Sequence, residues 1–141
     1  MLVLKYAAFI SITLKIKGSV NVKMISIRGA TTVEENTAES MLNNTKELLH
    51  KIIEENKIET DKVISILFTV TNDLNKVAPA KAARELGFVH AGLMCFNEMV
   101  VEGSLDKCIR VMILYNSNIN QADVKHIYLK GAKILRPDLR D

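Results

Sequence analysis

Hydrophobic residues recur along this chain with two different spacings, and each spacing predicts one kind of element. Across residues 36–57 they return every three to four positions, as on a helix with one apolar face. Asn36, with a glutamate three residues later, is typical of a helix start. Residues 78–86 predict a second, shorter helix, because Pro79 favours a first turn and Gly87 favours an end. The apolar face of the long helix comprises Met41, Leu42, Thr45, Leu48, Leu49, Ile52 and Ile53.

Shorter runs rich in β-branched residues predict strands. One of them, 62–71, is almost continuously apolar, which is typical of a central strand covered on both faces. A loop at 98–106 and a polar connection at 116–125, with one helical turn, separate the later elements. The other predicted strands are 24–29, 88–95, 107–115 and a pair of short strands around Gly131 within 126–138.

This order of elements predicts the α+β fold class. We expect a mixed five-stranded sheet with one long helix and one short helix on a single face. Two helices on one side leave the other face of the sheet uncovered, and a large bare face is typical of a surface that binds another subunit. The pattern therefore predicts an oligomer that assembles through the sheet.

The composition is that of one globular domain. The chain has 141 residues, of which 48% are hydrophobic and 25% are charged, and this is enough to build a core. The formal charge is +3, but Lys5, Lys15, Lys17 and Lys23 all lie in the first 23 residues, so the remainder carries −1. Because the domain has no basic stripe, we expect it to bind no nucleic acid.

The cysteines and histidines point away from metal and disulfide chemistry. Cys95 and Cys108 give no disulfide framework and suit a reducing compartment, so we expect a cytoplasmic protein. His50, His90 and His126 are scattered, and we expect neither a metal site nor a cofactor. The chain also lacks a glycine-rich phosphate loop and a Ser/His/Asp pattern.

Residues 1–23 are expected to form an N-terminal extension, with the domain itself at 24–141. The segment contains the nine-residue apolar run YAAFISITL, which is too short to span a membrane. Lysines follow the run, and no A-x-A cleavage pattern appears, so export is the least favoured interpretation. We interpret the extension as a misassigned start, with Met24 the true first residue, or as a disordered segment; an extra strand is the alternative.

Arg110 is the clearest candidate for chemistry. It stands inside the apolar strand KCIRVMILY, where a charge without a partner is costly. We expect it to be buried, with an anionic ligand as its partner, because a planar guanidinium suits carboxylates. A single arginine in such a place can also be an ion pair or a side chain that reaches solvent. Four arginines with apolar neighbours together favour the ligand: Arg28, Arg84, Arg110 and Arg136.

Three further side chains extend this candidate set. Glu98 lies among apolar residues after the third predicted strand, and it can pair with an arginine or accept a hydrogen bond from a ligand hydroxyl. Tyr128 can fill the core or donate to a carboxylate. Cys95 has no histidine beside it, so a small apolar role is favoured over a nucleophilic one.

Four stretches, taken together, resemble one family. The strings IRGATTVEENT, PAKAAREL, CIRVM and HIYLKGAKILRPDL, in this order and spacing, are similar to the monofunctional α/β-type chorismate mutases. The resemblance runs from Met24 to the end of the chain. It implies the rearrangement of chorismate to prephenate, a shikimate-pathway step toward phenylalanine and tyrosine. It also implies a homotrimeric pseudo-α/β-barrel with active sites between subunits, and it agrees with the bare sheet face expected above.

The resemblance also assigns roles to residues of this chain. Arg110 matches the arginine that reaches the ether oxygen and a carboxylate, and Glu98 and Cys95 match the pair at the ring hydroxyl. Arg28 and Tyr128 match residues that bind carboxylate. The remaining substrate-binding positions, which include those at the mouth of the site, are Ala80, Lys81, Arg84, Met94, Leu135 and Arg136.

The sequence departs from the family pattern beside the charged residues. Ala78 stands where a bulky aromatic residue is usual, and Met94 stands where a threonine is usual. The stretch from Arg84 to Cys95 is one residue shorter, and the tail is short, ending with RPDLRD. These departures concern the packing of the substrate ring and the closure of the site.

Two alternatives share the predicted architecture. The enamine/imine deaminase group is also trimeric with an arginine at a subunit cleft, but the IRGATTVE start and the set Glu98, Arg110 and Tyr128 argue against it. A non-catalytic trimer could bind an anion through the same arginines, because fold alone does not fix function. Turnover of chorismate distinguishes an enzyme from such a binding protein.

Overall fold

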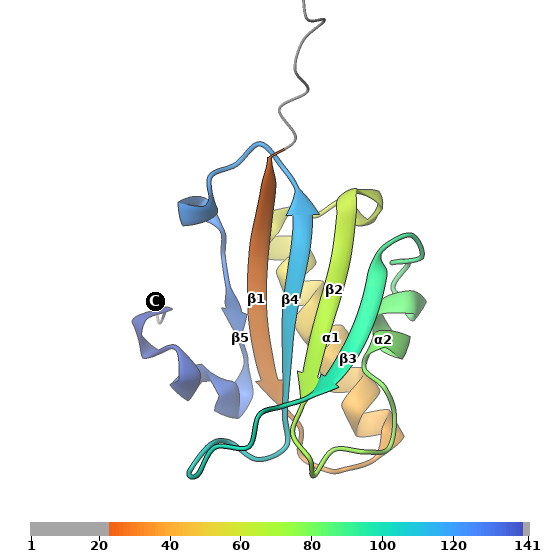
Figure 1. Ribbon diagram of the computed structural model, residues 1–141, viewed down its shortest axis with the longest axis vertical. Coiled ribbons are helices and arrows are strands. Elements are labelled where there is room, and N and C mark those ends of the chain that lie inside the picture. Colours follow the sequence, from red (N-terminus) through yellow and green to blue (C-terminus); the bar gives the residue numbers. More distant parts are fainter. Residues whose placement is uncertain (1–22, 140–141) are drawn as a thin grey trace, which may run out of the picture.

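Five strands form one mixed sheet in the structure, a computed structural model that describes residues 23–139 (Figure 1). They are β1 (Met24–Thr32), β2 (Val63–Val70), β3 (Gly92–Asn97), β4 (Cys108–Asn116) and β5 (Ile127–Tyr128). Their order across the sheet is β3-β2-β4-β1-β5. The pairs β1–β4 and β2–β4 are antiparallel, and the pairs β1–β5 and β2–β3 are parallel. The predicted fold class is confirmed, whereas residues 1–22 of the expected extension at 1–23 lie outside the described residues.

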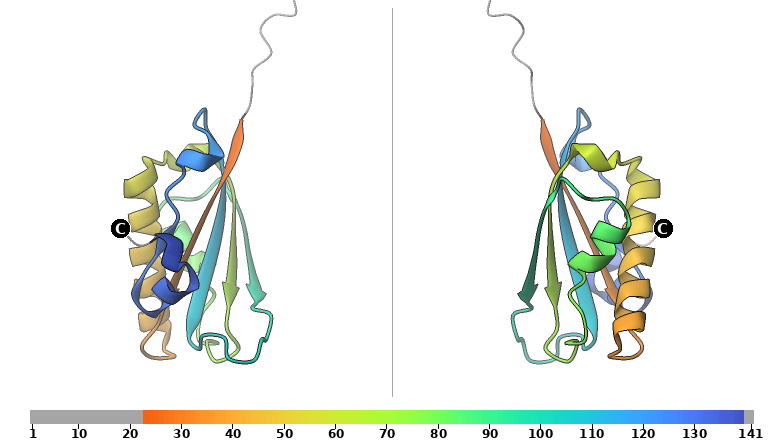
Figure 2. Two further views of the ribbon diagram at one scale, coloured as in Figure 1. Left: turned by 90° about the vertical axis from the view of Figure 1, so that its left-hand side faces the viewer. Right: turned by 90° about the vertical axis from the view of Figure 1, so that its right-hand side faces the viewer.

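Two α-helices, α1 (Ala38–Asn56) and α2 (Ala80–Glu85), lie against one face of this sheet (Figure 2). The long helix forms where the 3.6-residue pattern predicts it, and its apolar face packs on the inward-facing residues of β1, β2 and β4. Short 3-10 turns complete the described chain: η1 (Thr60–Lys62), η2 (Gln121–Asp123), η3 (Lys130–Leu135) and η4 (Pro137–Leu139). The largest fully buried side chains include Ile27, Met41, Leu48, Ile52, Ile66, Phe68, Phe88, Ile109 and Ile113.

Three sequence-based boundaries are wrong. The N-cap of α1 is Thr37, whose hydroxyl accepts a hydrogen bond from the Ser40 backbone N–H at 3.1 Å, rather than Asn36. The third strand begins at Gly92 rather than at residue 88. Phe88 lies in the loop before it, and its side chain is buried there. The predicted strand pair around Gly131 is one two-residue strand, β5, followed by the 3-10 turn η3.

The face of the sheet opposite the helices is open in the single chain, and it is partly apolar. Side chains alternate along a strand, so Arg110 and Met112 of β4 point to this face while their neighbours point to α1. The pairing register places Leu67 and Met94 in one row with Met112. Met94 and Met112 are exposed. The uncovered face predicted from the sequence is therefore present.

Gly29 allows β5 to lie close to β1. A Cβ atom at this position would be 2.8 Å from the backbone oxygen of Ile127 and 2.9 Å from Cδ1 of Ile52. Neither the pairing with β5 nor the packing against α1 leaves room for a side chain here. Because Arg28 precedes Gly29 and Tyr128 follows Ile127, this close approach brings two candidate site residues together.

Candidate active site

Arg110 and Glu98 form an ion pair on the open face of the sheet. The Nε atom of Arg110 lies 3.5 Å from a carboxylate oxygen of Glu98. The same oxygen accepts a hydrogen bond from the hydroxyl of Thr69, the residue opposite Arg110 on β2. The Glu98 backbone N–H donates to the Val70 carbonyl at 2.8 Å, which fixes the carboxylate just beyond the end of β3.

The expectation that Arg110 is buried is wrong for the single chain. Its side chain is 45% exposed, because strand alternation directs it to the face that the helices do not cover. A guanidinium has five donors, and the ion pair to Glu98 is made through the Nε side. The outer nitrogens of Arg110 are therefore placed to bind a further anionic group.

Arg28 lies on the same open face, close to Arg110. Ala30 pairs with Arg110 across β1 and β4, and Arg28 is two residues before it. Diagonal neighbours of this kind are about 7–8 Å apart, so one small ligand can contact both arginines. The Arg28 backbone N–H donates to Nδ1 of His126 at 3.0 Å. Burial, with help from the charges of Arg28 and Arg136, lowers the pKa of His126 and favours the neutral ring that can accept this bond.

Tyr128 and Leu135 contact a small apolar cluster at the same end of the sheet. The cluster consists of Ala30, Cys108 and Ala132, each of them buried. It joins the end of β1 and the start of β4 to the C-terminal turn η3. Burial raises the pKa of the Cys108 thiol, although the nearby Arg110 guanidinium acts in the opposite direction.

Arg136 makes a two-point ion pair with Asp138. Its Nε lies 2.8 Å from Oδ1 of Asp138 and its Nη2 lies 2.6 Å from Oδ2. The hydrogen bonds from Arg136 lower the pKa of Asp138 to about 2, and the charge of Arg28 adds to this effect. Both residues line a cavity of about 870 Å³ beside α1, to which His126 and Tyr128 also contribute.

The remaining candidates lie on α2 and β3, at the opposite edge of the sheet from β5. Lys81 and Arg84 are exposed on α2, whereas Ala80 is buried. Cys95 is exposed, and with neighbouring residues of the β2–α2 connection it lines a shallow hollow. Because Cys95 pairs with Phe68, which points to the helices, it faces away from Glu98. The structure therefore does not bring Cys95 and Glu98 together within one chain.

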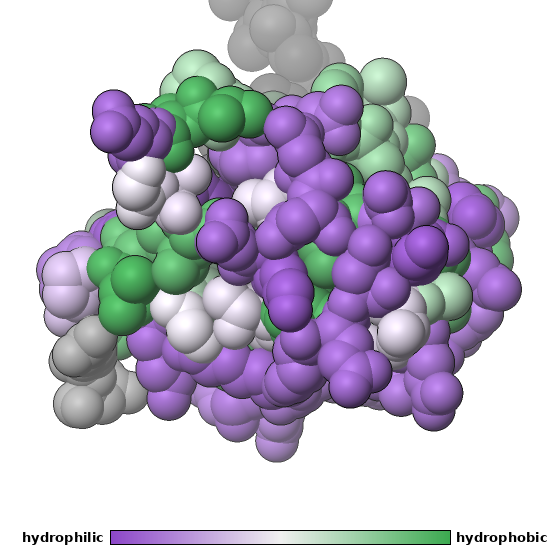
Figure 3. Space-filling view, turned by 90° about the horizontal axis from the view of Figure 1, so that it is seen from below, coloured by the Kyte–Doolittle hydropathy of each residue, from purple (hydrophilic) through white to green (hydrophobic). Residues whose placement is uncertain are grey.

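The candidate residues thus form two groups. The first, called the Arg110 group, lies on or beside the open face and comprises Arg28, Glu98, Arg110, Tyr128, Leu135 and Arg136. The second, called the Arg84 group, lies on α2 and β3 and comprises Ala80, Lys81, Arg84, Met94 and Cys95. Figure 3 shows the end of the molecule at which β1, β2 and β3 finish, where hydrophilic residues dominate and hydrophobic ones form separate patches.

Comparison with known proteins identifies the family. A family model described as "Chorismate mutase type I" matches residues 24–139. The chain belongs to the type I chorismate mutases. The resemblance of the four sequence strings to chorismate mutases is therefore confirmed.

Several chorismate mutases are similar to this chain over most of their length. The chorismate mutase AroH of Bacillus subtilis (strain 168) is 49% identical over 114 residues, which are 80% of this chain and 90% of that protein. The chorismate mutase AroH of Thermus thermophilus is 46% identical over 114 residues, with coverages of 80% and 93%. The solved chorismate mutase from Clostridium thermocellum Cth-682 has a TM-score of 0.76 and 51% identity, and the match covers 77% of this chain and 97% of that one.

Three residues of this type I chorismate mutase contribute to the site without having been singled out in the sequence as parts of it. They are Thr69, which donates to Glu98, His126, which accepts from Arg28, and Asp138, which pairs with Arg136. For Thr69 the only signal in the sequence was strand alternation, which indicates the face of the sheet to which its side chain points. His126 and Asp138 are each two residues from a site candidate, and a spacing of two places them nearby only once the local backbone is known.

Two other kinds of feature are absent from residues 23–139. No group of three or more His, Cys, Asp or Glu side chains in this range could hold a metal ion. No helix in the same range is long and apolar enough to cross a membrane.

Acidification is expected to destabilise the protein through His126. Its pKa is lower in the folded chain than the value of about 6.5 for a free imidazole, so folding favours the neutral ring. This contribution to stability is present above pH 6.5 or so and is lost as the pH falls through the folded-state pKa. Thermal unfolding between pH 8 and pH 5 should show a larger loss for the wild type than for His126→Asn. Asparagine keeps an acceptor for Arg28 but does not titrate, so equal losses in both proteins would contradict this assignment.

Proposed function

We propose that the Arg110 group is the part of this chain that binds and rearranges chorismate. The activity of the family is a unimolecular isomerisation of chorismate to prephenate, in which no group is transferred to or from the protein. An enzyme can accelerate such a reaction by holding a reactive conformer and by stabilising the charge that develops in the transition state. The observation that carries the proposal is the pairing of Arg110 with Glu98 on the open face.

Arg110 supplies the charge stabilisation in this proposal. Negative charge grows on the ether oxygen of chorismate as its bond to carbon breaks, and a cation placed there acts more strongly on the transition state than on the substrate. Glu98, which itself accepts a hydrogen bond from the hydroxyl of Thr69, pairs with one side of the guanidinium, so little reorganisation is required during the reaction. The carboxylate of Glu98 also has capacity to accept a hydrogen bond from the ring hydroxyl of the substrate.

Arg28, Tyr128 and Arg136 supply the clamps for the two substrate carboxylates. Clamping both ends restricts the flexible enolpyruvyl side chain to conformations in which the reacting atoms are close. In the free chain the guanidinium of Arg136 is engaged by Asp138. These bonds do not use the Nη1 donors of Arg136, so these donors can bind a substrate carboxylate.

We further propose that the site is completed in a homotrimer. The Arg84 group lies at the β3 edge of the sheet, whereas the Arg110 group, apart from Glu98, lies on β4, on β1 and on the segment from β5 onward, so one chain does not surround a single ligand with both. The partly apolar open face is a suitable contact surface, and a head-to-tail ring of three chains brings the first group of one subunit to the second group of its neighbour. Each of the three sites then uses residues from two subunits.

Mixing two inactive variants tests this arrangement. Chains with Arg110→Ala and chains with Arg84→Glu, unfolded together and reassembled in equal amounts, should recover activity in about one quarter of the sites, since a ring of random composition joins two intact groups with that frequency. The matched control mixes Arg110→Ala with Arg28→Ala, which lie in the same group and should give no recovery. Absence of recovery in the first mixture, in particles shown by light scattering to be trimers, would place the site within one subunit.

A further inference from the structure

Lys130 is a charged residue at a sharp turn beside the proposed site. It begins η3, two residues after Tyr128, and its backbone is left-handed, with φ of 51°. This conformation turns the chain from β5 into the 3-10 turn. A non-glycine residue in this region is disfavoured unless its surroundings hold it there.

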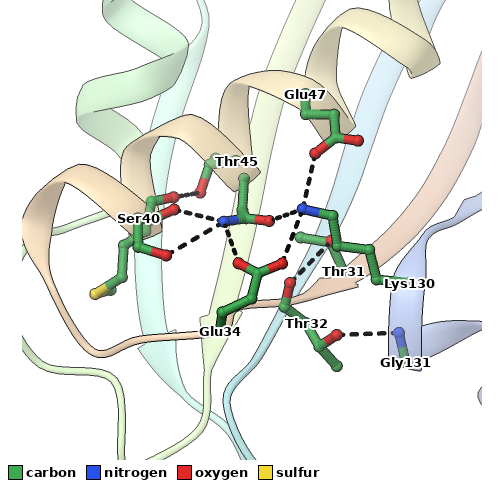
Figure 4. Close-up of polar contacts among 10 residues, drawn as sticks. Thr31, Thr32, Glu34, Ser40, Thr45, Glu47, Lys130 and Gly131 are labelled. Carbon is green, nitrogen blue, oxygen red and sulfur yellow. Dashed lines mark hydrogen bonds and ion pairs between the residues drawn. The ribbon is translucent and has the colours of Figure 1, made fainter.

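The side chain of Lys130 reaches three acceptors from two other segments (Figure 4). Its ammonium nitrogen lies 3.0 Å from Glu47 on α1 and 3.3 Å from Glu34 in the β1–α1 loop. It also donates a hydrogen bond to the side-chain oxygen of Asn44. Desolvation lowers the pKa of Lys130, but the hydrogen bonds and charges of Glu47 and Glu34 outweigh it and raise the pKa overall. The lysine is thus charged and held from three directions.

The acceptors are themselves fixed, so the position of Lys130 is well defined. Asn44 is only 5% exposed, and its amide group donates to the Ser40 carbonyl at 2.8 Å and to the other oxygen of Glu34 at 3.2 Å. Hydrogen bonds from the backbone and from Asn44 and Lys130 lower the pKa of Glu34. The orientation of the Asn44 amide leaves its oxygen toward Lys130.

The backbone on each side of Lys130 is bound to β1. The Leu129 N–H donates to the Ala30 carbonyl at 2.9 Å, and the Gly131 N–H donates to the hydroxyl of Thr32 at 3.0 Å. Since β5 has only two residues, strand pairing alone provides little restraint on Tyr128. The side chain of Lys130 adds an ion pair and a hydrogen bond from this segment to α1.

We propose that Lys130 is a positioning residue that fixes the position of Tyr128 at the mouth of the site. Through the turn η3 it also fixes the position of Leu135. This inference rests on the proposed role of Tyr128 in carboxylate binding. Lys130 acts at a distance, because its ammonium group is bound to α1 and to the loop that precedes it rather than directed to the open face. Tyr128 binds a group that does not react, and Arg28 and Arg136 continue to clamp the carboxylates when it moves, so its displacement weakens substrate and transition state alike.

Steady-state kinetics of Lys130→Met, with chorismate as the probe, test the proposal. Methionine keeps most of the side-chain length and loses the charge. We expect KM to rise about 10-fold or more with kcat close to the wild-type value, since misplacing a binding group by about 1 Å can cost up to 100-fold. Lys130→Arg should recover most of the loss, and Lys62→Met, which removes a surface lysine paired with Glu59, should behave as wild type.

A double-mutant cycle with Tyr128→Phe separates positioning from a purely structural role. If Lys130 acts through the tyrosine hydroxyl, Lys130→Met raises KM far less in the Tyr128→Phe background than in the wild type. Equal effects in both backgrounds, or a lower melting temperature with unchanged KM, would overturn the proposal. If Lys130→Met does not fold, Glu47→Gln provides the same cycle with a milder change. Absence of turnover in the wild type would refute the proposed function itself, and that result is distinct from each of these.

Discussion

Replacing Arg110 by alanine is expected to lower kcat for chorismate by roughly 100- to 1000-fold, the range measured when one preorganised donor to a developing oxyanion is removed. This corresponds to a barrier increase on the order of 3 kcal/mol. The loss falls on kcat because the charge on the ether oxygen exists fully only in the transition state. Chorismate loss and prephenate formation, followed in the same assay, give the measurement.

Two further variants show whether the geometry of Arg110 matters beyond its charge. Arg110→Lys keeps a cation but loses the planar fork, so it should recover only a small part of the activity. Lys62→Ala removes a cation from a surface pair with Glu59 and should leave kcat unchanged. A fully active Arg110→Ala protein would mean that the ion pair with Glu98 is structural and that the reaction takes place elsewhere.

Phe68→Ala should be the most destabilising substitution among those considered, with a loss of about 3–5 kcal/mol in the free energy of unfolding. The phenyl ring is fully buried between β2 and the helices, in the core that supports the strand carrying Thr69. Truncation removes apolar contacts and leaves a cavity that close-packed neighbours cannot fill. Urea unfolding followed by circular dichroism measures the loss, at one fixed subunit concentration because an oligomer is more stable when concentrated.

Ile64→Ala is the matched control for Phe68→Ala. Ile64 is on the same strand and is also apolar, but it is 46% exposed in the single chain. Its truncation should cost less than about 1 kcal/mol, because most of its surface is not buried by the fold. Equal losses for the two variants would show that position along β2, rather than burial in this core, determines the cost.

The sequence was sufficient for the elements whose pattern is long and regular. The apolar repeat of α1 extends over five turns, and the alternation in β4 places Arg110 on the face opposite to Ile109 and Val111. The uncovered face also followed from counting helices against strands. These features depend on local periodicity, which a sequence carries directly.

Other features depend on contacts that a sequence does not contain. Phe88 is apolar and close to a strand, but it lies in the loop between α2 and β3, from which its side chain enters the main core. The segment after Tyr128 has a strand-like composition, yet Lys130 turns it into a 3-10 helix because α1 and the β1–α1 loop offer acceptors there. The exposure of Arg110 in the single chain could not be predicted, since the sequence does not say whether the apolar face around Arg110 is covered by the same chain or by another subunit.

The place of β1 in the sheet has a consequence for the order of events during synthesis. It is the first strand made, but its two neighbours, β4 and β5, are the last. Thr32 cannot meet Cys108, nor Ala30 meet Tyr128, until nearly the whole domain has left the ribosome. Contacts between segments so distant along the chain form slowly, because a long loop must close before they are made. Until then β1 has unpaired backbone groups on both edges, and the domain completes its sheet only when β5 is available.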